Sequence, residues 1–92
     1  MLSKEIEISA KKLKAFANGN RLNILYYILD DELSVNKIEK KTGLSQSALS
    51  QHLAVLREAD VVKTRRNAQT IYYTVKDEKV KRLLLLLQEI FL

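Results

Sequence analysis

The chain has 92 residues, of which 47% are hydrophobic and 29% are charged, and its formal net charge at pH 7 is +5. This length supports one domain with a modest core, and the apolar fraction is that of a globular chain and not of a disordered one. Because the chain has no cysteine, it cannot form a disulfide or a thiolate metal site. With no proline and only two glycines, its helices are expected to run without interruption.

The sequence carries no signal for secretion or for membrane insertion. Its first residues include Lys4, Glu5 and Glu7, which do not match a basic start followed by an apolar stretch. The leucine run Leu83–Leu87 is far too short to cross a bilayer. We therefore expect a cytoplasmic protein with no membrane partner.

The positive charge is concentrated in one segment. Residues 1–36 and 77–92 each balance their basic and acidic side chains, whereas residues 37–76 hold eight Lys or Arg against three Asp or Glu. A local basic excess of this kind is typical of a surface that binds phosphate groups of a nucleic acid. The plainer alternative is a solvated basic face.

Two helices are predicted in the first third of the chain. Residues 3–17 form the first, with Asn18–Asn20 as a break, and Asn20 can cap the second over residues 21–30. The acidic run Asp30–Glu32 ends the second helix; it resembles a cation site, but carboxylates at a helix end are usually only exposed. The apolar stripe of the first helix consists of Ile6, Ala10, Leu13, Phe16 and Ala17.

The stretch Ile38–Leu56 reads IEKKTGLSQSALSQHLAVL and predicts two short helices joined by a tight turn. Ser34 can cap a helix that ends at Thr42, and Gly43 can take the left-handed conformation that stops it. Ser45 can then cap a helix from Gln46 to about Ala59. The inward side of this helix is predicted to be Leu49, Leu53 and Leu56, and its polar side Gln46, Ser47, Ser50, Gln51 and His52.

A helix with leucines behind and small amides and hydroxyls in front suits insertion into a DNA major groove. Gln51 is the candidate for adenine, because its amide matches the N6 and N7 edge, and Ala48 can either meet a thymine methyl or pack inward. His52 is the only histidine. Since zinc needs three or four ligands, we predict that His52 lies near a phosphate, and we predict no metal and no cofactor.

After this helix the period of the sequence changes. Residues 61–65 and 69–75 are β-branched and aromatic, and the second run alternates, which predicts a β-hairpin joined by Arg66–Ala68, with Asn67 tolerating a positive φ. A hairpin directly after a recognition helix is the wing of a winged helix domain, and its cations are expected to lie along the DNA backbone. The full set of predicted DNA contacts is Lys41, Ser45, Gln46, Ser47, Ala48, Ser50, Gln51, His52, Arg57, Arg65, Arg66, Asn67 and Gln69.

Asp77 is predicted to cap a last helix over residues 78–92, whose apolar side chains cover too much of its circumference for one buried face. A symmetric dimer through the first and last helices would cover the spare surface. The alternative hypothesis is a helix that lies on a membrane surface. Such a helix needs a strongly basic polar face, and because this helix is charge-neutral we favour the dimer. The predicted dimer interface consists of Leu2, Ile6, Leu13, Phe16, Leu83, Leu84, Leu87, Ile90 and Phe91.

The stretch LSQSALSQHLAVLREADVV (Leu44–Val62), followed by a short hairpin, closely resembles the ArsR/SmtB family of bacterial winged helix-turn-helix repressors. The resemblance extends over nearly the whole chain and includes ANGNRLNILYYI (Ala17–Ile28). It implies one domain over residues 1–92 with four helices, two strands and a last helix, mainly α with a small β-hairpin. It also implies a homodimer that binds an imperfect inverted repeat in promoter DNA and blocks transcription until an effector releases it.

The sensing half of the family pattern is missing. Metal-sensing members carry a cysteine motif where this chain has Leu33–Asn36, or His and carboxylate ligands on the last helix, where it has Asp77 and Glu78 without histidine. In sulfur-sensing members of the BigR/HlyU-like subgroup, which shares the RRN…IYY wing, cysteines stand at the positions that match Tyr26 and Leu92. The resemblance therefore leaves the effector unknown.

A second reading of the same sequence is a winged helix that serves as a protein–protein adaptor. Salt separates the two readings, because binding through several phosphate contacts weakens steeply with ionic strength and an apolar adaptor surface does not. An enzyme is not expected, since the chain has no glycine-rich phosphate loop and no convincing pair of nucleophile and base.

Overall fold

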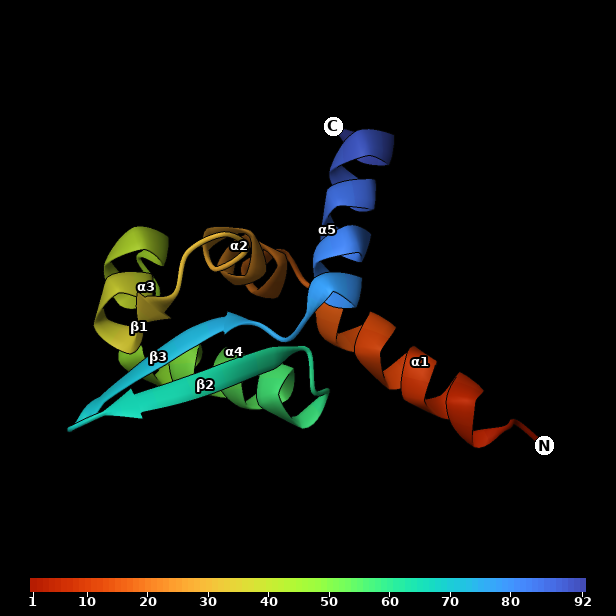
Figure 1. Cartoon of the computed structure of the whole chain (residues 1–92), viewed down its shortest axis with the longest axis horizontal. Coiled ribbons are helices and arrows are strands. Elements are labelled where there is room, and N and C mark those ends of the chain that lie inside the picture. The colour runs from red at the N-terminus through yellow and green to blue at the C-terminus, as the bar shows by residue number, and fades with distance from the viewer.

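The computed structural model describes all residues from 1 to 92, and it confirms the predicted mainly α fold with a small sheet. In Figure 1, the middle helices and the strands form the body, and the first and last helices project from one side of it. The elements in chain order are α1 (Lys4–Phe16), α2 (Gly19–Tyr27), β1 (Leu33–Ser34), α3 (Val35–Thr42), α4 (Gln46–Glu58), β2 (Val62–Asn67), β3 (Thr70–Val75) and α5 (Glu78–Phe91).

The start and the end of α2 differ from the prediction. Asn18, and not Asn20, caps this helix, because its backbone is extended and its Oδ1 accepts from Arg21 N at 3.1 Å. The helix ends at Tyr27, three residues earlier than predicted, although the following Ile28 and Leu29 remain buried. The prediction followed the apolar pattern, which continues through these two buried residues, whereas the helical hydrogen bonding ends before them.

The helix-turn-helix forms as predicted. Ser34 and Ser45 cap α3 and α4, their Oγ atoms each accepting at 3.2 Å from Lys37 N and Ala48 N. Gly43 has φ +72°, a conformation that glycine adopts without a steric penalty. These end signals are local, so they can be read from sequence alone.

The sheet has three antiparallel strands in the order β1-β3-β2. The predicted hairpin is present, but β2 continues to Asn67, and the turn is made by Ala68 and Gln69. Within this turn the residue with positive φ is Ala68, at +56°, and not Asn67. The short β1 was not predicted, because two residues carry no alternation; it forms where Leu33 and Ser34 pair with β3.

One apolar core holds the elements together. All seventeen buried residues are hydrophobic, and they include Ile38 of α3 and the predicted stripe of α4, Leu49, Leu53 and Leu56. The lower part of α5 joins this core through Val80 and Leu84, and Asp77 caps it as predicted, accepting at 3.0 Å from Val80 N. The rest of α5 projects from the body.

Candidate nucleic-acid interface

The outer side of α4 is a continuous polar surface. Burial of the leucine stripe holds the helix against the core, so that Gln46, Ser47, Ser50 and Gln51 are exposed. The two hydroxyls and the two amides on this side can donate to and accept from base edges. The structure thus brings together the predicted base-reading residues on one exposed side of α4.

Three other predicted contacts on α4 have partners or are partly covered. The Ser45 hydroxyl caps the helix, and Ala48 is half-buried, which favours its packing role. His52 is also half-buried, and its Nδ1 lies 3.5 Å from Nη1 of Arg21, at the start of α2. Because a guanidinium only donates, Nδ1 of His52 can accept from Arg21 in the tautomer that carries its proton on Nε2.

Neighbouring arginines in the wing point to opposite sides of the sheet. Arg66 pairs with Ile71 and shares the side of Tyr73, whose ring is buried and whose hydroxyl accepts a hydrogen bond from Arg57 of α4. Side chains alternate along a strand, so Arg65 faces the other way. Arg66 is therefore the wing cation on the same side as the recognition helix.

Arg65 is engaged within the protein. Its Nε and Nη2 donate to both carboxylate oxygens of Glu32 at distances of 2.7 to 3.1 Å, and its guanidinium lies 4.4 Å from the centroid of the Tyr72 ring. The hydrogen bonds from Arg65 hold the pKa of the Glu32 carboxyl below its ordinary value, and Glu32 in turn raises the pKa of Arg65. This clamp of Glu32, Arg65 and Tyr72 ties the wing to the residue before β1.

Of the remaining predicted cations, some contact other side chains of the protein and one does not. Arg57 bonds to Tyr73 and so fixes α4 against the wing, while Lys41 lies with its Nζ 5.6 Å from the centroid of the Tyr27 ring. At the tip, Arg66, Asn67 and Gln69 are exposed and have no side-chain hydrogen bond within the protein. The tip therefore presents one free cation and two free amides.

The predicted dimer face needs two corrections. Leu84 is fully buried and Phe16 is 6% exposed, because both pack inside one protomer, which leaves them almost no surface for a second copy. Leu83 and Leu87 are half-buried. The other predicted residues are exposed: Leu2, Ile6, Leu13, Ile90 and Phe91.

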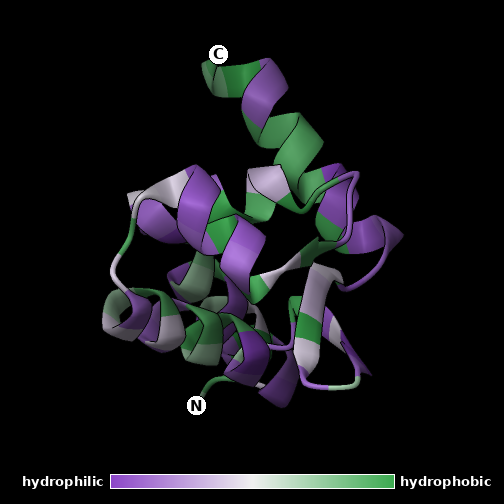
Figure 2. Ribbon diagram, turned by 90° about the vertical axis from the view of Figure 1, so that its left-hand side faces the viewer, coloured by the Kyte–Doolittle hydropathy of each residue, from purple (hydrophilic) through white to green (hydrophobic).

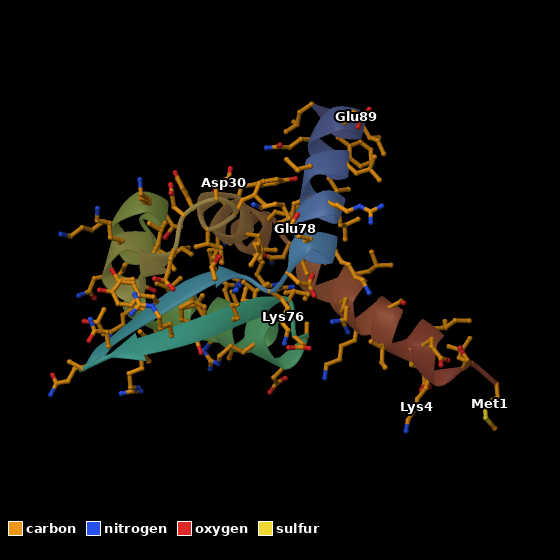
Figure 3. The ribbon with its side chains drawn as sticks, viewed as in Figure 1. Met1, Lys4, Asp30, Lys76, Glu78 and Glu89 are labelled. Atoms are coloured by element: carbon orange, nitrogen blue, oxygen red, sulfur yellow. The ribbon has the colours of Figure 1, made fainter.

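The exposed apolar residues lie on the projecting parts of the molecule. Figure 2 shows α5 as a largely hydrophobic helix standing away from the body, and Leu85 and Leu86 add to its exposed apolar surface. Figure 3 shows Lys4 and Glu89 near the free ends of α1 and α5, where no other element covers the side chains. Both helices therefore have apolar surface that nothing in one protomer covers.

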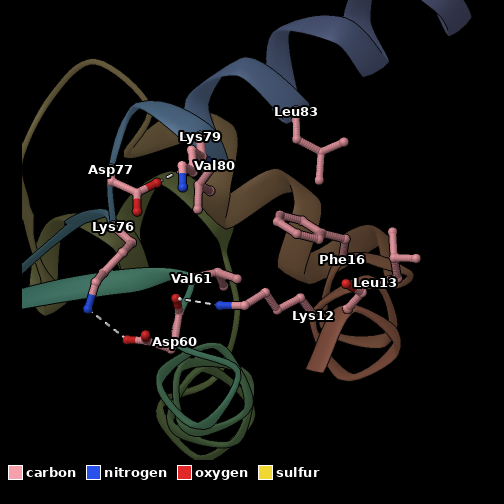
Figure 4. A pocket seen from close by; sticks show the side chains of 11 residues that line it. Lys12, Leu13, Phe16, Asp60, Val61, Lys76, Asp77, Lys79, Val80 and Leu83 are labelled. Carbon is pink, nitrogen blue, oxygen red and sulfur yellow. Dashed lines mark hydrogen bonds and ion pairs between the residues drawn. The ribbon is translucent and has the colours of Figure 1, made fainter. Parts of the chain in front are cut away.

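A cavity of about 380 Å³ lies where α1, the end of α4 and the start of α5 meet (Figure 4). Leu13, Phe16 and Leu83 are among its apolar lining residues. At its edge, Lys12 Nζ donates to the backbone oxygens of Ala59 and Asp60 at 3.1 and 3.3 Å. Lys12 thus binds carbonyls at the end of the recognition helix, where a cation is favoured by the helix dipole.

The roles of Glu32, Arg21 and Lys12 could not be predicted from sequence. Each contacts a residue more than thirty positions away, at Arg65, His52 and Ala59 respectively. A single charged residue is not part of a repeating pattern in the sequence, so no periodicity indicates its role. Only the folded arrangement shows which partner it meets.

No helix is both long enough and apolar enough to span a bilayer. No group of three or more His, Cys, Asp or Glu side chains is placed to hold a metal ion.

Comparison with known proteins shows where this arrangement recurs. Residues 18–64 match the family model described as bacterial regulatory protein, arsR family. The transcriptional activator HlyU of Vibrio cholerae is 51% identical over 79 residues, covering 86% of this chain and 73% of that protein. The biofilm growth-associated repressor of Xylella fastidiosa is 38% identical over 82 residues, covering 89% of this chain and 72% of that protein.

Solved structures agree with these matches. A structure of HlyU from Vibrio cholerae N16961 superposes with a TM-score of 0.89 at 46% identity, over 98% of both chains. The homodimeric winged helix-turn-helix DNA-binding domain Mb0332 from Mycobacterium bovis superposes with a TM-score of 0.89 at 32% identity, over 97% of this chain and 86% of that one. These relatives are transcription regulators and not enzymes. The chain belongs to the arsR family of bacterial regulatory proteins, and it is a DNA-binding transcription regulator with a winged helix-turn-helix fold.

Proposed function

We propose that this protein is a homodimeric repressor that binds a specific inverted-repeat operator in bacterial promoter DNA and acts in the cytoplasm. The observation that carries the proposal is the exposed polar side of α4, held outward by a fully buried leucine stripe. Ser47, Ser50 and Gln51 are the base-reading residues, because their hydroxyls and amide can reach base edges in a major groove. Arg66 supplies a phosphate contact from the wing.

The dimer is proposed from the uncovered apolar surface of α1 and α5. Leu13 is 59% exposed, Ile90 60% and Phe91 74%, which are unusual values for large apolar side chains on adjacent helices. A second copy related by twofold symmetry would cover both helices at once, burying about 1,500 Å², an ordinary area for such an interface. The Mb0332 domain, which is homodimeric, supports a dimer of this chain.

Twofold symmetry sets the form of the operator. Two recognition helices on one side of the duplex enter successive major grooves about 34 Å apart, so the half-sites are inverted and one helical turn apart. A dimer bound over a promoter covers DNA that RNA polymerase needs, which favours repression. HlyU is named a transcriptional activator. If this protein activated transcription instead, deleting its gene would lower the expression of a reporter placed under its target promoter.

The recognition residues are tested with Gln51→Ala. Loss of a bidentate amide contact is expected to cost about 1–3 kcal/mol at particular base pairs and almost nothing on a scrambled duplex. Fluorescence anisotropy on operator DNA with single base-pair changes measures both quantities. Gln69→Ala removes the same amide from the wing tip, where a contact to the DNA backbone is predicted, so it should weaken binding to cognate and scrambled DNA by the same factor.

The assignment of Gln51 fails if Gln51→Ala weakens binding to cognate and scrambled DNA by the same factor. It also fails if every base-pair change costs the variant as much as it costs the wild type. A salt-independent affinity for DNA would point instead to a protein–protein adaptor.

A further inference from the structure

A second basic surface borders the recognition helix. A cleft of about 350 Å³ lies between α1, the start of α2 and the second half of α4. Its basic lining consists of Lys11, Lys14 and Arg21, and Val55 and Glu58 of α4 form the facing wall. None of these cations belongs to the segment that carries the net positive charge of the sequence.

The cleft and the wing lie on opposite sides of α4. Residues two positions apart in a helix are separated by about 200°, so Val55 and Arg57 point in nearly opposite directions. Arg57 bonds to Tyr73 of the wing, whereas Val55 lines the cleft. The exposed Gln51 lies between these two sides, next to the cleft wall.

An α-helix in a major groove lies between two sugar–phosphate backbones. The wing provides Arg66 for the backbone on its own side. The opposite backbone needs cations on the other side of α4, and the cleft is the basic surface there.

Lys11 and Lys14 are available for such a contact. Both are exposed, and neither ammonium group forms an ion pair or a hydrogen bond within the protein, although Glu58 lines the same cleft. On α1, Leu13 faces the proposed dimer partner. Lys11 is two positions before Leu13, so its side chain points to the opposite side of the helix. A second copy on the apolar side of α1 therefore leaves Lys11 uncovered.

Arg21 is held in a fixed position. Its Nε donates to Ala15 O at 2.7 Å and its Nη2 to Lys14 O at 3.2 Å, which ties it to the end of α1. Its third contact is with His52 of α4. Arg21 is thus a rigid cation in the cleft, whereas the two lysines can move to meet a ligand.

We propose that this cleft binds a backbone phosphate of double-stranded DNA on the side of the recognition helix opposite to the wing. Lys11 and Lys14 contact the phosphate, and Arg21 fixes the local positive charge. The inference rests on the proposed function and adds a second, sequence-independent contact to it. It gives α1 a part in DNA binding besides its part in the dimer.

The test is the double variant Lys11→Gln with Lys14→Gln, titrated on operator and scrambled duplexes over a series of salt concentrations. The dimer has two such clefts, so loss of one phosphate contact in each should make the slope of log K against log salt less steep by about 1.8. The loss of affinity relative to the wild type should therefore be roughly 60-fold larger at 0.1 M than at 1 M salt. Both duplexes should lose the same factor, because phosphates carry no sequence information. Lys11→Arg with Lys14→Arg should bind like the wild type.

The matched control is Lys79→Gln with Arg82→Gln, which removes the same charge from exposed positions of α5. It should leave the slope unchanged. If the control loses as much affinity as the cleft variant, or if the cleft variant keeps the wild-type slope while the wild type prefers its operator, the cleft proposal alone is overturned. A wild type without salt-sensitive DNA binding would overturn the cleft and the proposed function together.

Discussion

Arg65 and Arg66 are adjacent in sequence and have different environments. Arg65 is held by the carboxylate of Glu32 and by the face of Tyr72, whereas Arg66 has no internal partner and lies on the side of α4. Both were predicted from the sequence as DNA contacts. The alternation of a strand shows that two neighbouring side chains point to opposite sides of the sheet, but it does not show which of them forms an ion pair within the protein. That partner lies thirty-three residues away.

Arg66→Ala is therefore expected to weaken DNA binding more than Arg65→Ala. Removing Arg66 deletes one free cation from each protomer of the dimer, so the slope of log K against log salt should become less steep by about 1.8. Arg65 is already neutralised by Glu32, so its removal should change the slope by much less. Salt titrations of both variants on one duplex make the comparison, and equal slopes for the two would contradict the assignment.

The Glu32–Arg65 pair also predicts a pH dependence. The pKa of Glu32 is lowered in the folded protein, so the pair stabilises the fold above the ordinary carboxyl pKa, and this contribution is lost as the pH falls through the lowered value. The thermal stability of the wild type should exceed that of Glu32→Gln near neutral pH, and the two should converge once the pH falls below the lowered pKa of Glu32. A difference that persists or grows in acid would show that the pair does not carry it.

At the scale of elements, the turn between α3 and α4 sets the angle of the recognition helix. Gly43 has φ +72°, and a side chain there is strained whatever the space around it. Gly43→Ala is expected to lower the free energy of unfolding by about 1 kcal/mol, because alanine disfavours the left-handed region. Denaturant unfolding measures the change.

Gly19→Ala is the matched control. Gly19 is the first residue of α2, its φ is not positive, and nothing lies within 4 Å of an added Cβ. The substitution should be neutral or slightly stabilising, since alanine favours a helix. A loss at Gly19 equal to that at Gly43 would mean that backbone conformation is not the cause.

The elements that could be predicted are those with a local signal. Ser34, Ser45 and Asp77 cap helices where their own sequence neighbourhoods indicate it. The features that were not predicted depend on distant partners or on a choice between neighbouring residues. Strand β1 forms only by pairing with β3, and Asn18 rather than Asn20 caps α2. At the hairpin, pairing continues to Asn67 and Thr70, so the turn lies at residues 68 and 69 and not at residues 66–68.

At the scale of the molecule, the apolar surface of α1 and α5 predicts the oligomeric state. Ile90→Glu places a charge in the proposed interface and should convert the dimer to a monomer, while Glu89→Gln, one residue away, should remain dimeric. Sedimentation at micromolar concentration distinguishes these states. An Ile90→Glu protein that remains dimeric would require another interface.

Exposure was predicted more fully for the side chains of α4 and the wing tip than for those of the proposed dimer face. A recognition helix is read from one amphipathic period, and the structure leaves its polar side open. The dimer residues required a choice among many leucines on α5, and periodicity could not tell Leu84, which the core takes up, from Ile90, which remains exposed. The α1–α4 cleft required the tertiary structure.

We propose that two protomers bind one specific DNA site through α4. Fluorescence anisotropy tests this most directly, with DNA from the protein's own promoter and with a scrambled duplex, at low and at moderate salt. We expect tighter, salt-sensitive binding to the promoter DNA, with two protomers per site. Weak binding that ignores the sequence would contradict it, and would leave the fold in place with a partner protein as the better occupant of its surface.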